Sequence, residues 1–171
     1  MNRKILFWPH KLLRNISRNV IKINKYTYKL IATMAIIITK QKFVAGLAAP
    51  QVGHNINIIM LNFKSEICLP SQTYIDEILI LINPKIIKSS GYAIWNEECL
   101  SIPSESGFVK RQKYSLISFM NIHGRLSIVT VSNFMSICIQ HEIDHLKGIL
   151  WIDYQTELKR VVVRKKMLKY K

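Results

Sequence analysis

The sequence predicts an α+β fold, in which short β-strands follow one another between helices instead of alternating with them. Two observations carry this prediction. Short isoleucine-rich segments succeed one another through the middle of the chain, and apolar residues recur at helical spacing toward both ends. Segregated strands and helices are typical of α+β proteins, whereas regular alternation predicts a parallel βαβ sheet.

The N-terminal half contains one predicted helix and two predicted strands. The helix covers residues 22–39, although the β-branched run at 36–38 lowers its helix propensity. Residues 55–63 (NINIIMLNF) and 78–87 (ILILINPKII) are short runs of β-branched and apolar residues. Runs of this length and composition are predicted to be strands.

The C-terminal half contains further strands and then two helices. Residues 107–131 are predicted to form two or three strands, with a turn at 121–124 (NIHG). Residues 133–147 place apolar residues and histidines at helical spacing, and Gly148 is a natural end for that helix. A last helix is predicted over residues 156–170.

The chain is strongly basic, with 25 Lys+Arg against 10 Asp+Glu in 171 residues and a formal net charge of +15. This surplus favours a polyanionic partner such as nucleic acid, and the alternative is a lysine-rich, solvated surface. A hydrophobic content of 49% excludes a disordered basic tail protein. The length suits one domain with its own core, so we expect a single domain over residues 1–171.

Cysteine usage and the N-terminal segment bear on location. Three widely spaced cysteines, Cys68, Cys99 and Cys138, cannot all pair, which favours a reducing compartment. No acidic residue precedes Glu66, and an N-terminus that lacks acidic residues is also typical of an organelle presequence. The apolar run at 30–39 is well short of the roughly 20 residues that span a bilayer. We expect a cytoplasmic protein with no membrane partner.

The sharpest local signal is the HExxH pattern at 141–145 (HEIDH). Residues four apart lie on one face of a helix, so His141 and His145 can bind one metal ion, with Glu142 placed to handle the proton of a bound water. The alternative is a pair of helix histidines whose hydrogen bonds are satisfied in the core.

A third ligand must come from upstream of the HExxH pattern. Metzincins continue the motif with a histidine, but that position holds Trp151, and the only downstream glutamate, Glu157, lies in a basic stretch. Cys99, in the segment EECLS, is a good candidate for a thiolate ligand. Cys138 is one position outside the histidine pair and is better explained by core packing. A free cysteine is most often a small buried hydrophobe, which is the alternative for Cys99 as well.

A third segment of interest is the loop GLAAPQVG at 46–53. Its small residues permit close approach of the backbone to a ligand, and Pro50 fixes the turn. Gln51 offers both a hydrogen-bond donor and an acceptor. Taken alone, the segment is better explained as an ordinary small-residue loop.

These three segments, in this order, resemble the peptide deformylase family. The chain has VAGLAAPQ (44–51) against GxGLAAPQ, EECLS (97–101) against EGCLS, and QHEIDHLKG (140–148) against QHExDHLxG. The resemblance implies the family's fold: short antiparallel β-sheets packed around a central HExxH helix, with an N-terminal and a C-terminal helix. It begins at Ile5, so no cleavable presequence is expected.

The resemblance also implies an activity, namely removal of the formyl group from the N-terminal formyl-methionine of newly made polypeptides. Cys99, His141 and His145 would hold one divalent ion, ferrous iron in the family, although Zn²⁺ or another ion suits the same ligands. Glu142 would be general base and then general acid, acting on a metal-bound water. Gln51 and the backbone N–H of Leu100 would stabilise the oxyanion.

The resemblance places the substrate methionine in an apolar pocket beside the metal. By motif position, the residues expected to bind substrate are Ala45, Gly46, Glu97, Glu98, Ile137 and Cys138. Glu97 would also belong to the scaffold behind the metal site. Gln140 and Asp144 would orient the metal ligands.

Two residues depart from the family pattern beside the chemistry: Val44 and Glu98 each stand where the pattern has glycine. Glu98 adds a negative charge that would change either peptide preference or the pKa of the bound water. We expect an active enzyme that is impaired or specialised. The competing interpretations are another HExxH hydrolase, such as a peptidase, and a silent paralogue that binds nascent chains or the ribosome.

The C-terminal segment, residues 155–171, is predicted to be a basic helix. Its cations suit contact with ribosomal RNA phosphates, and the alternative is a plain solvated helix. Its predicted inward face consists of Leu158, Val161, Val162 and Leu168.

Overall fold

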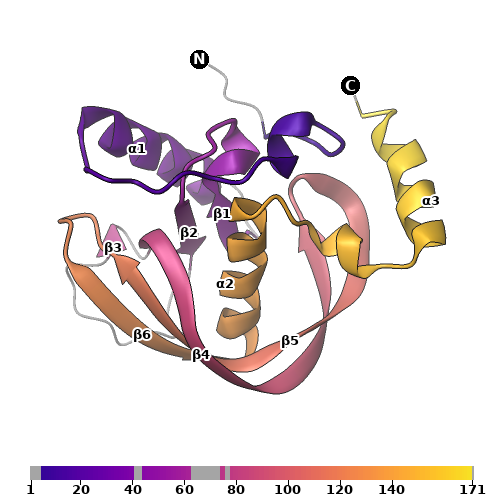
Figure 1. Ribbon diagram of the computed structural model, residues 1–171. Helices are drawn as coiled ribbons and strands as arrows, with labels where there is room; N and C mark the ends of the chain where they lie inside the picture. The colour runs from indigo at the N-terminus through magenta and orange to yellow at the C-terminus, as the bar shows by residue number, and fades with distance from the viewer. Residues whose placement is uncertain (1–4, 41–43, 63–73, 76–77, 171) are drawn as a thin grey trace.

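The computed structural model describes residues 5–40, 44–62, 74–75 and 78–170 (Figure 1). It contains one antiparallel sheet and three α-helices, which confirms the predicted α+β class. Cys68 lies outside the described residues. Within the described part of the chain, every helix is too short or too polar to cross a membrane.

Helix α1 (Lys25–Thr39) confirms the predicted N-terminal helix. It begins with a capping box, in which the Asn24 side chain accepts from the Thr27 N–H at 3.1 Å and the Thr27 hydroxyl accepts from the Asn24 N–H at 3.4 Å. The β-branched run at 36–38 does not end the helix. Leu30 and Met34, with their helical neighbours, are buried in one apolar cluster with strand residues, and this packing outweighs the weak local propensity.

A six-stranded, fully antiparallel sheet forms the rest of the framework. The strands are β1 (Gly46–Ala48), β2 (Ile58–Asn62), β3 (Tyr74–Ile75), β4 (Ile78–Cys99), β5 (Ile102–Met120) and β6 (Leu126–Ser132). Their order is β1-β2-β4-β5-β6, and β3 pairs with β4. The predicted strand at 55–63 is β2, and the predicted 107–131 region is β5 and β6, joined by the predicted turn.

Strand β4 is much longer than the predicted strand at 78–87, because it continues without a break to Cys99. Its second half is largely exposed, so no inward apolar alternation marks it in the sequence. Its strand geometry comes instead from pairing with β5, which runs from Ser90 opposite Tyr114 to Glu98 opposite Ser106. Register shifts interrupt this pairing, and β4 and β5 curve together around α2 (Figure 1).

Helix α2 (Asn133–Leu146) lies in the hollow of the curved sheet (Figure 1). Met135, Ile139 and Ile143 are buried in one apolar cluster with side chains of β2, β4, β5 and β6. The helix is followed by Gly148, whose φ of +73° is left-handed. A Cβ at this position would lie 2.4 Å from the carbonyl oxygen of Arg14, so glycine is required both by conformation and by the packed N-terminal segment.

Helix α3 (Glu157–Met167) confirms the predicted C-terminal helix, but its inward face is not the predicted one. The buried residues are Val163 and Met167, which join Trp151 and the N-terminal segment in a third apolar cluster. The residues predicted to face inward are all exposed: Leu158, Val161, Val162 and Leu168. The spacing of apolar residues did not identify the buried face of α3. Most of its remaining residues are cations, and more than one set of its apolar residues can line up along one side of the helix.

Candidate metal centre and active site

The structure brings the three predicted metal ligands together. His141 and His145 lie one turn apart on α2, and Cys99 ends β4, where it turns back into β5. The Cys99 Sγ lies 3.2 Å from the His145 Nε2, and one ligand atom from each of the three residues lies within 4.8 Å of the others. Both histidines are buried.

The chemistry and spacing of these donors fit a single divalent ion. Metal–sulfur and metal–nitrogen bonds of about 2.3 and 2.0 Å place the ligands of a tetrahedral ion roughly 3.5 Å apart. A thiolate with two imidazoles suits zinc, iron and related transition metals. The His141 Nδ1 lies 2.8 Å from the Glu97 Oε2, which leaves its Nε2 for the ion. The predicted ligand set is therefore compatible with metal binding.

A buried ion-pair network holds the His141 ring in place. The Arg111 guanidinium donates to both carboxylate oxygens of Glu97, at 2.7 and 3.0 Å, and also to Asp144. The Tyr154 hydroxyl donates to the same Asp144 at 2.8 Å. Burial alone would raise the pKa of Glu97, but the bonds from Arg111 and His141 bring it below its usual value. Glu97 is thus a carboxylate that fixes the His141 ring.

Asp144 and Gln140 act less directly than predicted. Asp144 reaches the metal site only through Arg111 and Glu97. Gln140 hydrogen-bonds the backbone N–H of Gln112 at 3.0 Å and its carbonyl at 2.8 Å, so it fastens α2 to β5. The prediction that Gln140 orients a metal ligand is wrong.

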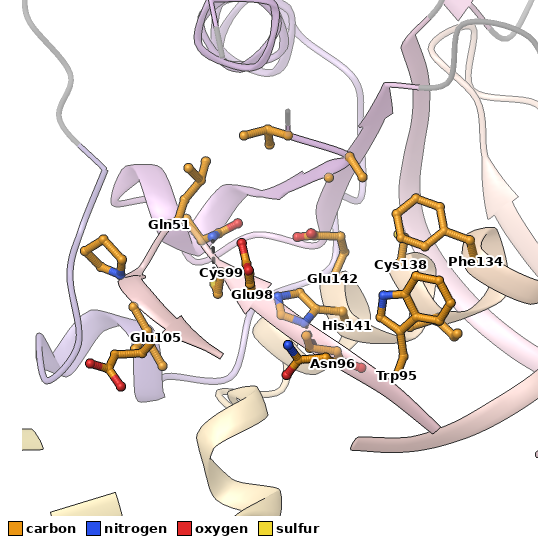
Figure 2. A pocket seen from close by; sticks show the side chains of 18 of the residues that line it. Gln51, Trp95, Asn96, Glu98, Cys99, Glu105, Phe134, Cys138, His141 and Glu142 are labelled. Atoms are coloured by element: carbon orange, nitrogen blue, oxygen red, sulfur yellow. Dashed lines mark hydrogen bonds and ion pairs between the residues drawn. The ribbon is translucent and has the colours of Figure 1, made fainter. Parts of the chain in front are cut away.

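Gln51 is held with its amide nitrogen toward the metal site. It lies in the short 3₁₀ turn η2 (Ala49–Val52), and its Oε1 accepts from the Ala48 N–H at 2.8 Å. Its Nε2 lies 3.3 Å from the Ser101 hydroxyl and 3.5 Å from the Cys99 Sγ (Figure 2). Because one end of the amide is fixed by a backbone donor, the other end must present N–H groups to the site.

Glu142 is 4% exposed, and its carboxylate points into the cavity (Figure 2). Its Oε2 has no hydrogen-bond partner among the described residues. Burial raises the pKa of Glu142 to about 7. Gly46 packs directly on it, since a Cβ there would lie 2.3 Å from the Oε1. A buried carboxyl poised near neutrality can both take up and release a proton.

Cys99, His141 and Glu142 line one cavity of about 480 Å³. All six predicted substrate-binding residues line it: Ala45, Gly46, Glu97, Glu98, Ile137 and Cys138. Leu100, in the turn between β4 and β5, lines it too. Burial raises the pKa of the Cys138 thiol far above its usual range, so this cysteine stays protonated and serves as an apolar wall.

Sequence reasoning missed Arg111 and the aromatic wall of the cavity. Arg111 lies in the run KRQK at 110–113, which looks like a solvated surface, yet its side chain is 5% exposed. One available signal was strand parity, because Arg111 shares a strand face with the buried Val109. Trp95 and Phe134 line the cavity with ring centroids 5.4 Å apart. Trp95 lies in the part of β4 that was not predicted to be a strand.

Comparisons with known proteins identify the family of this chain. A family model described as polypeptide deformylase matches residues 2–161. The chain is 42% identical over 168 residues to the peptide deformylase of Buchnera aphidicola from Schizaphis graminum, covering 98% of this chain and 95% of that protein. The chain belongs to the peptide deformylase family. Another relative is the peptide deformylase of Baumannia cicadellinicola, at 39% identity over 95% of this chain and 92% of that protein.

Solved structures of the peptide deformylase family confirm the fold. The peptide deformylase of Ehrlichia chaffeensis in complex with actinonin superposes with a TM-score of 0.88 at 30% identity, covering 98% of this chain and 96% of that one. The enzyme from Legionella pneumophila gives a TM-score of 0.86 at 30% identity, covering 98% and 94%. Family membership favours a deformylase over the other interpretations of the HExxH pattern.

Proposed function

We propose that this chain is a metal-dependent hydrolase that removes the formyl group from the N-terminal formyl-methionine of newly made polypeptides. One observation carries the proposal: in a chain of the peptide deformylase family, a Cys-His-His donor set opens through Cys99 and His141 onto a cavity that the buried Glu142 also lines. We further propose that residues 1–171 form one catalytic domain. In support, Leu13 and Met167, from opposite ends of the chain, share an apolar cluster.

We propose that Cys99, His141 and His145 hold the ion, with Fe²⁺ as the expected metal and Zn²⁺ or another divalent ion as the alternative. When bound, such an ion would polarise the formyl carbonyl and acidify a water. The chain's own contribution is the fixed ligand geometry, since the Glu97–Arg111 network holds the His141 ring in one orientation.

Glu142 is proposed to move the proton. Its carboxylate would accept a proton from the attacking water and then deliver it to the amine nitrogen that leaves with methionine. Both transfers need a group that is neither permanently ionised nor permanently protonated at neutral pH. The elevated pKa of Glu142, caused by its burial, supports this assignment.

Gln51 and Leu100 are proposed to stabilise the oxyanion formed on the formyl carbon. The Gln51 Nε2 is aimed at the metal site by the bond that its Oε1 accepts from Ala48. The Leu100 backbone N–H lies in the adjoining turn. A donor fixed in advance toward a developing oxyanion typically contributes roughly 3–4 kcal/mol.

The methionine side chain is proposed to enter the part of the cavity lined by Ile137, Cys138, Trp95 and Phe134. These side chains are apolar or aromatic and can enclose an unbranched thioether. Ala45 and Gly46 would contact the peptide backbone because their small side chains leave room for close approach.

The direct test is formate release from formyl-Met-Ala-Ser by protein loaded anaerobically with Fe²⁺. Formate release at a catalytic rate is expected. A silent paralogue that binds ribosomes or nascent chains is the second candidate, since Val44 and Glu98 both line the cavity and depart from the family pattern. No formate from the iron-loaded protein, with ribosome binding retained, would establish that candidate.

Cys99→Ser is expected to lower the bound metal from about one ion per chain to a small fraction, because an alcohol is a far weaker ligand than a thiolate. Metal content of the dialysed protein measures this. Cys138→Ser is the matched control, since Cys138 lies at the cavity wall but outside the ligand set. Full metal retention by Cys99→Ser would contradict the proposed site.

We propose that α3 contacts ribosomal RNA. Arg160, Arg164 and Lys165 are exposed on it, and Lys169 is exposed just after its end. Replacing these four by Gln is expected to weaken ribosome co-sedimentation and to reduce its dependence on salt. Substitution is preferable to truncation because α3 also contributes Val163 and Met167 to the core. Unchanged co-sedimentation would remove α3 from the interface.

An enzyme working on emerging chains belongs where they are made, and we propose the cytoplasm.

A further inference from the structure

The active-site cavity is acidic in a protein that is otherwise basic. Four of the ten acidic residues of the chain line it: Glu97, Glu98, Glu105 and Glu142. None of its described lining residues is Lys or Arg, although the chain has 25 of them. The cavity therefore presents carboxylates to whatever enters it.

Three of these four carboxylates have a partner or an assigned role. Glu97 is paired with Arg111, and Glu105 accepts from the Lys166 Nζ at 2.6 Å. Glu142 is buried beside the metal ligands. Glu98 differs from all three, because it is exposed and enters no ion pair or hydrogen bond with any described side chain.

Strand geometry directs Glu98 at the substrate. Successive side chains of β4 point to opposite faces, so Glu97 turns toward Arg111 while Glu98 lies on the opposite face, where it stays unpaired among the described side chains and lines the cavity. Glu98 lines the cavity, and Figure 2 draws its side chain among those that surround it. A register shift between Glu98 and Cys99 ends the regular pairing of β4 with β5. Because Glu98 directly precedes Cys99, its negative charge lies immediately beside a proposed metal ligand.

The substrate itself offers no positive charge at its N-terminus, because formylation converts the amine into a neutral amide. A charge that complements Glu98 must therefore come from a side chain further along the peptide. Each extended residue advances about 3.3 Å, and a lysine side chain reaches roughly twice that distance. With the formyl carbon at the metal site and Glu98 directly before Cys99 in the chain, the first two residues after methionine are the ones expected to come within reach of Glu98.

We infer that Glu98 makes this enzyme selective for formyl-methionyl peptides that carry Lys or Arg in one of the two residues after methionine. The inference rests on the proposed deformylase activity and names its preferred substrates. Because Glu98 is exposed, its attraction is screened, and about a fivefold preference in kcat/KM is the size expected for such an ion pair.

The test compares kcat/KM for formyl-Met-Lys-Ser and formyl-Met-Ser-Lys with that for formyl-Met-Ala-Ser, using the full metal-loaded chain. At least one lysine peptide is expected to be preferred about fivefold. Glu98→Gln keeps the shape and removes the charge, so the preference should fall to about one. It should persist in Glu98→Asp, and it should shrink in high salt in the unchanged protein.

The matched control is Glu157→Gln, which removes an exposed carboxylate at the start of α3, outside the cavity, and should leave the preference unchanged. Equal rates for the lysine and alanine peptides in the unchanged protein would overturn the inference, as would a preference that survives Glu98→Gln. Absence of formate from every peptide is a different result, because it would contradict the proposed activity itself.

Discussion

Replacing Glu142 by Gln is expected to lower kcat/KM for formyl-Met-Ala-Ser by about 10²- to 10⁴-fold, the usual contribution of a positioned general acid–base. Glutamine has the shape of glutamate but cannot accept the proton of the attacking water. The fold should be kept, because Gln fills the same space beneath Gly46 and removes a buried carboxyl. Formate release measures the loss.

Metal content separates this effect from loss of the site. Glu142 is not one of the three grouped donors, so Glu142→Gln should retain as much metal as the unchanged protein. Glu157→Gln makes the same change at an exposed position and should keep full activity. If Glu142→Gln were fully active with its metal bound, another group would have to carry the proton, and the assignment of Glu142 would be wrong.

Features set by neighbouring residues were predictable from the sequence. The HExxH pattern defines its own geometry once its segment is helical, so His141, Glu142 and His145 lie where the four-residue spacing predicts. The residues that adjoin them come from distant strands. Cys99 was only one option from spacing alone, and it became the expected ligand through its resemblance to a family motif.

Features set by tertiary pairing were not predictable in the same way. The second half of β4 has an exposed, mostly polar sequence whose strand geometry depends on β5. That half carries Trp95, so the aromatic wall of the cavity was hidden along with it, whereas Glu97 was expected behind the metal site only through the family resemblance. Arg111 was missed because its run KRQK looks like a solvated surface, and only strand parity with Val109 sets it apart from its lysine neighbours. Only the facing carboxylates of Glu97 and Asp144 explain its burial.

Replacing Arg111 by Met is expected to lower the free energy of unfolding by about 3–5 kcal/mol, because it leaves Glu97 and Asp144 buried without their shared cation. For a chain of this size, that corresponds to a fall in Tm of roughly 6–20 °C. Metal affinity should fall by about 10- to 100-fold as His141 loses its fixed orientation. Urea denaturation and metal titration measure the two effects.

The matched control is Arg14→Met, which breaks the Arg14–Asp153 pair, where both side chains are about one-third exposed at 35% and 30%. Exposed pairs contribute only about 0–1 kcal/mol, so a small loss is expected there and no change in metal affinity. Equal losses in the two variants would mean that burial of the Glu97–Arg111–Asp144 network does not matter. If Arg111→Met were stable but bound metal weakly, the network would orient His141 without stabilising the fold. That result would contradict the stability prediction and support the role in metal binding.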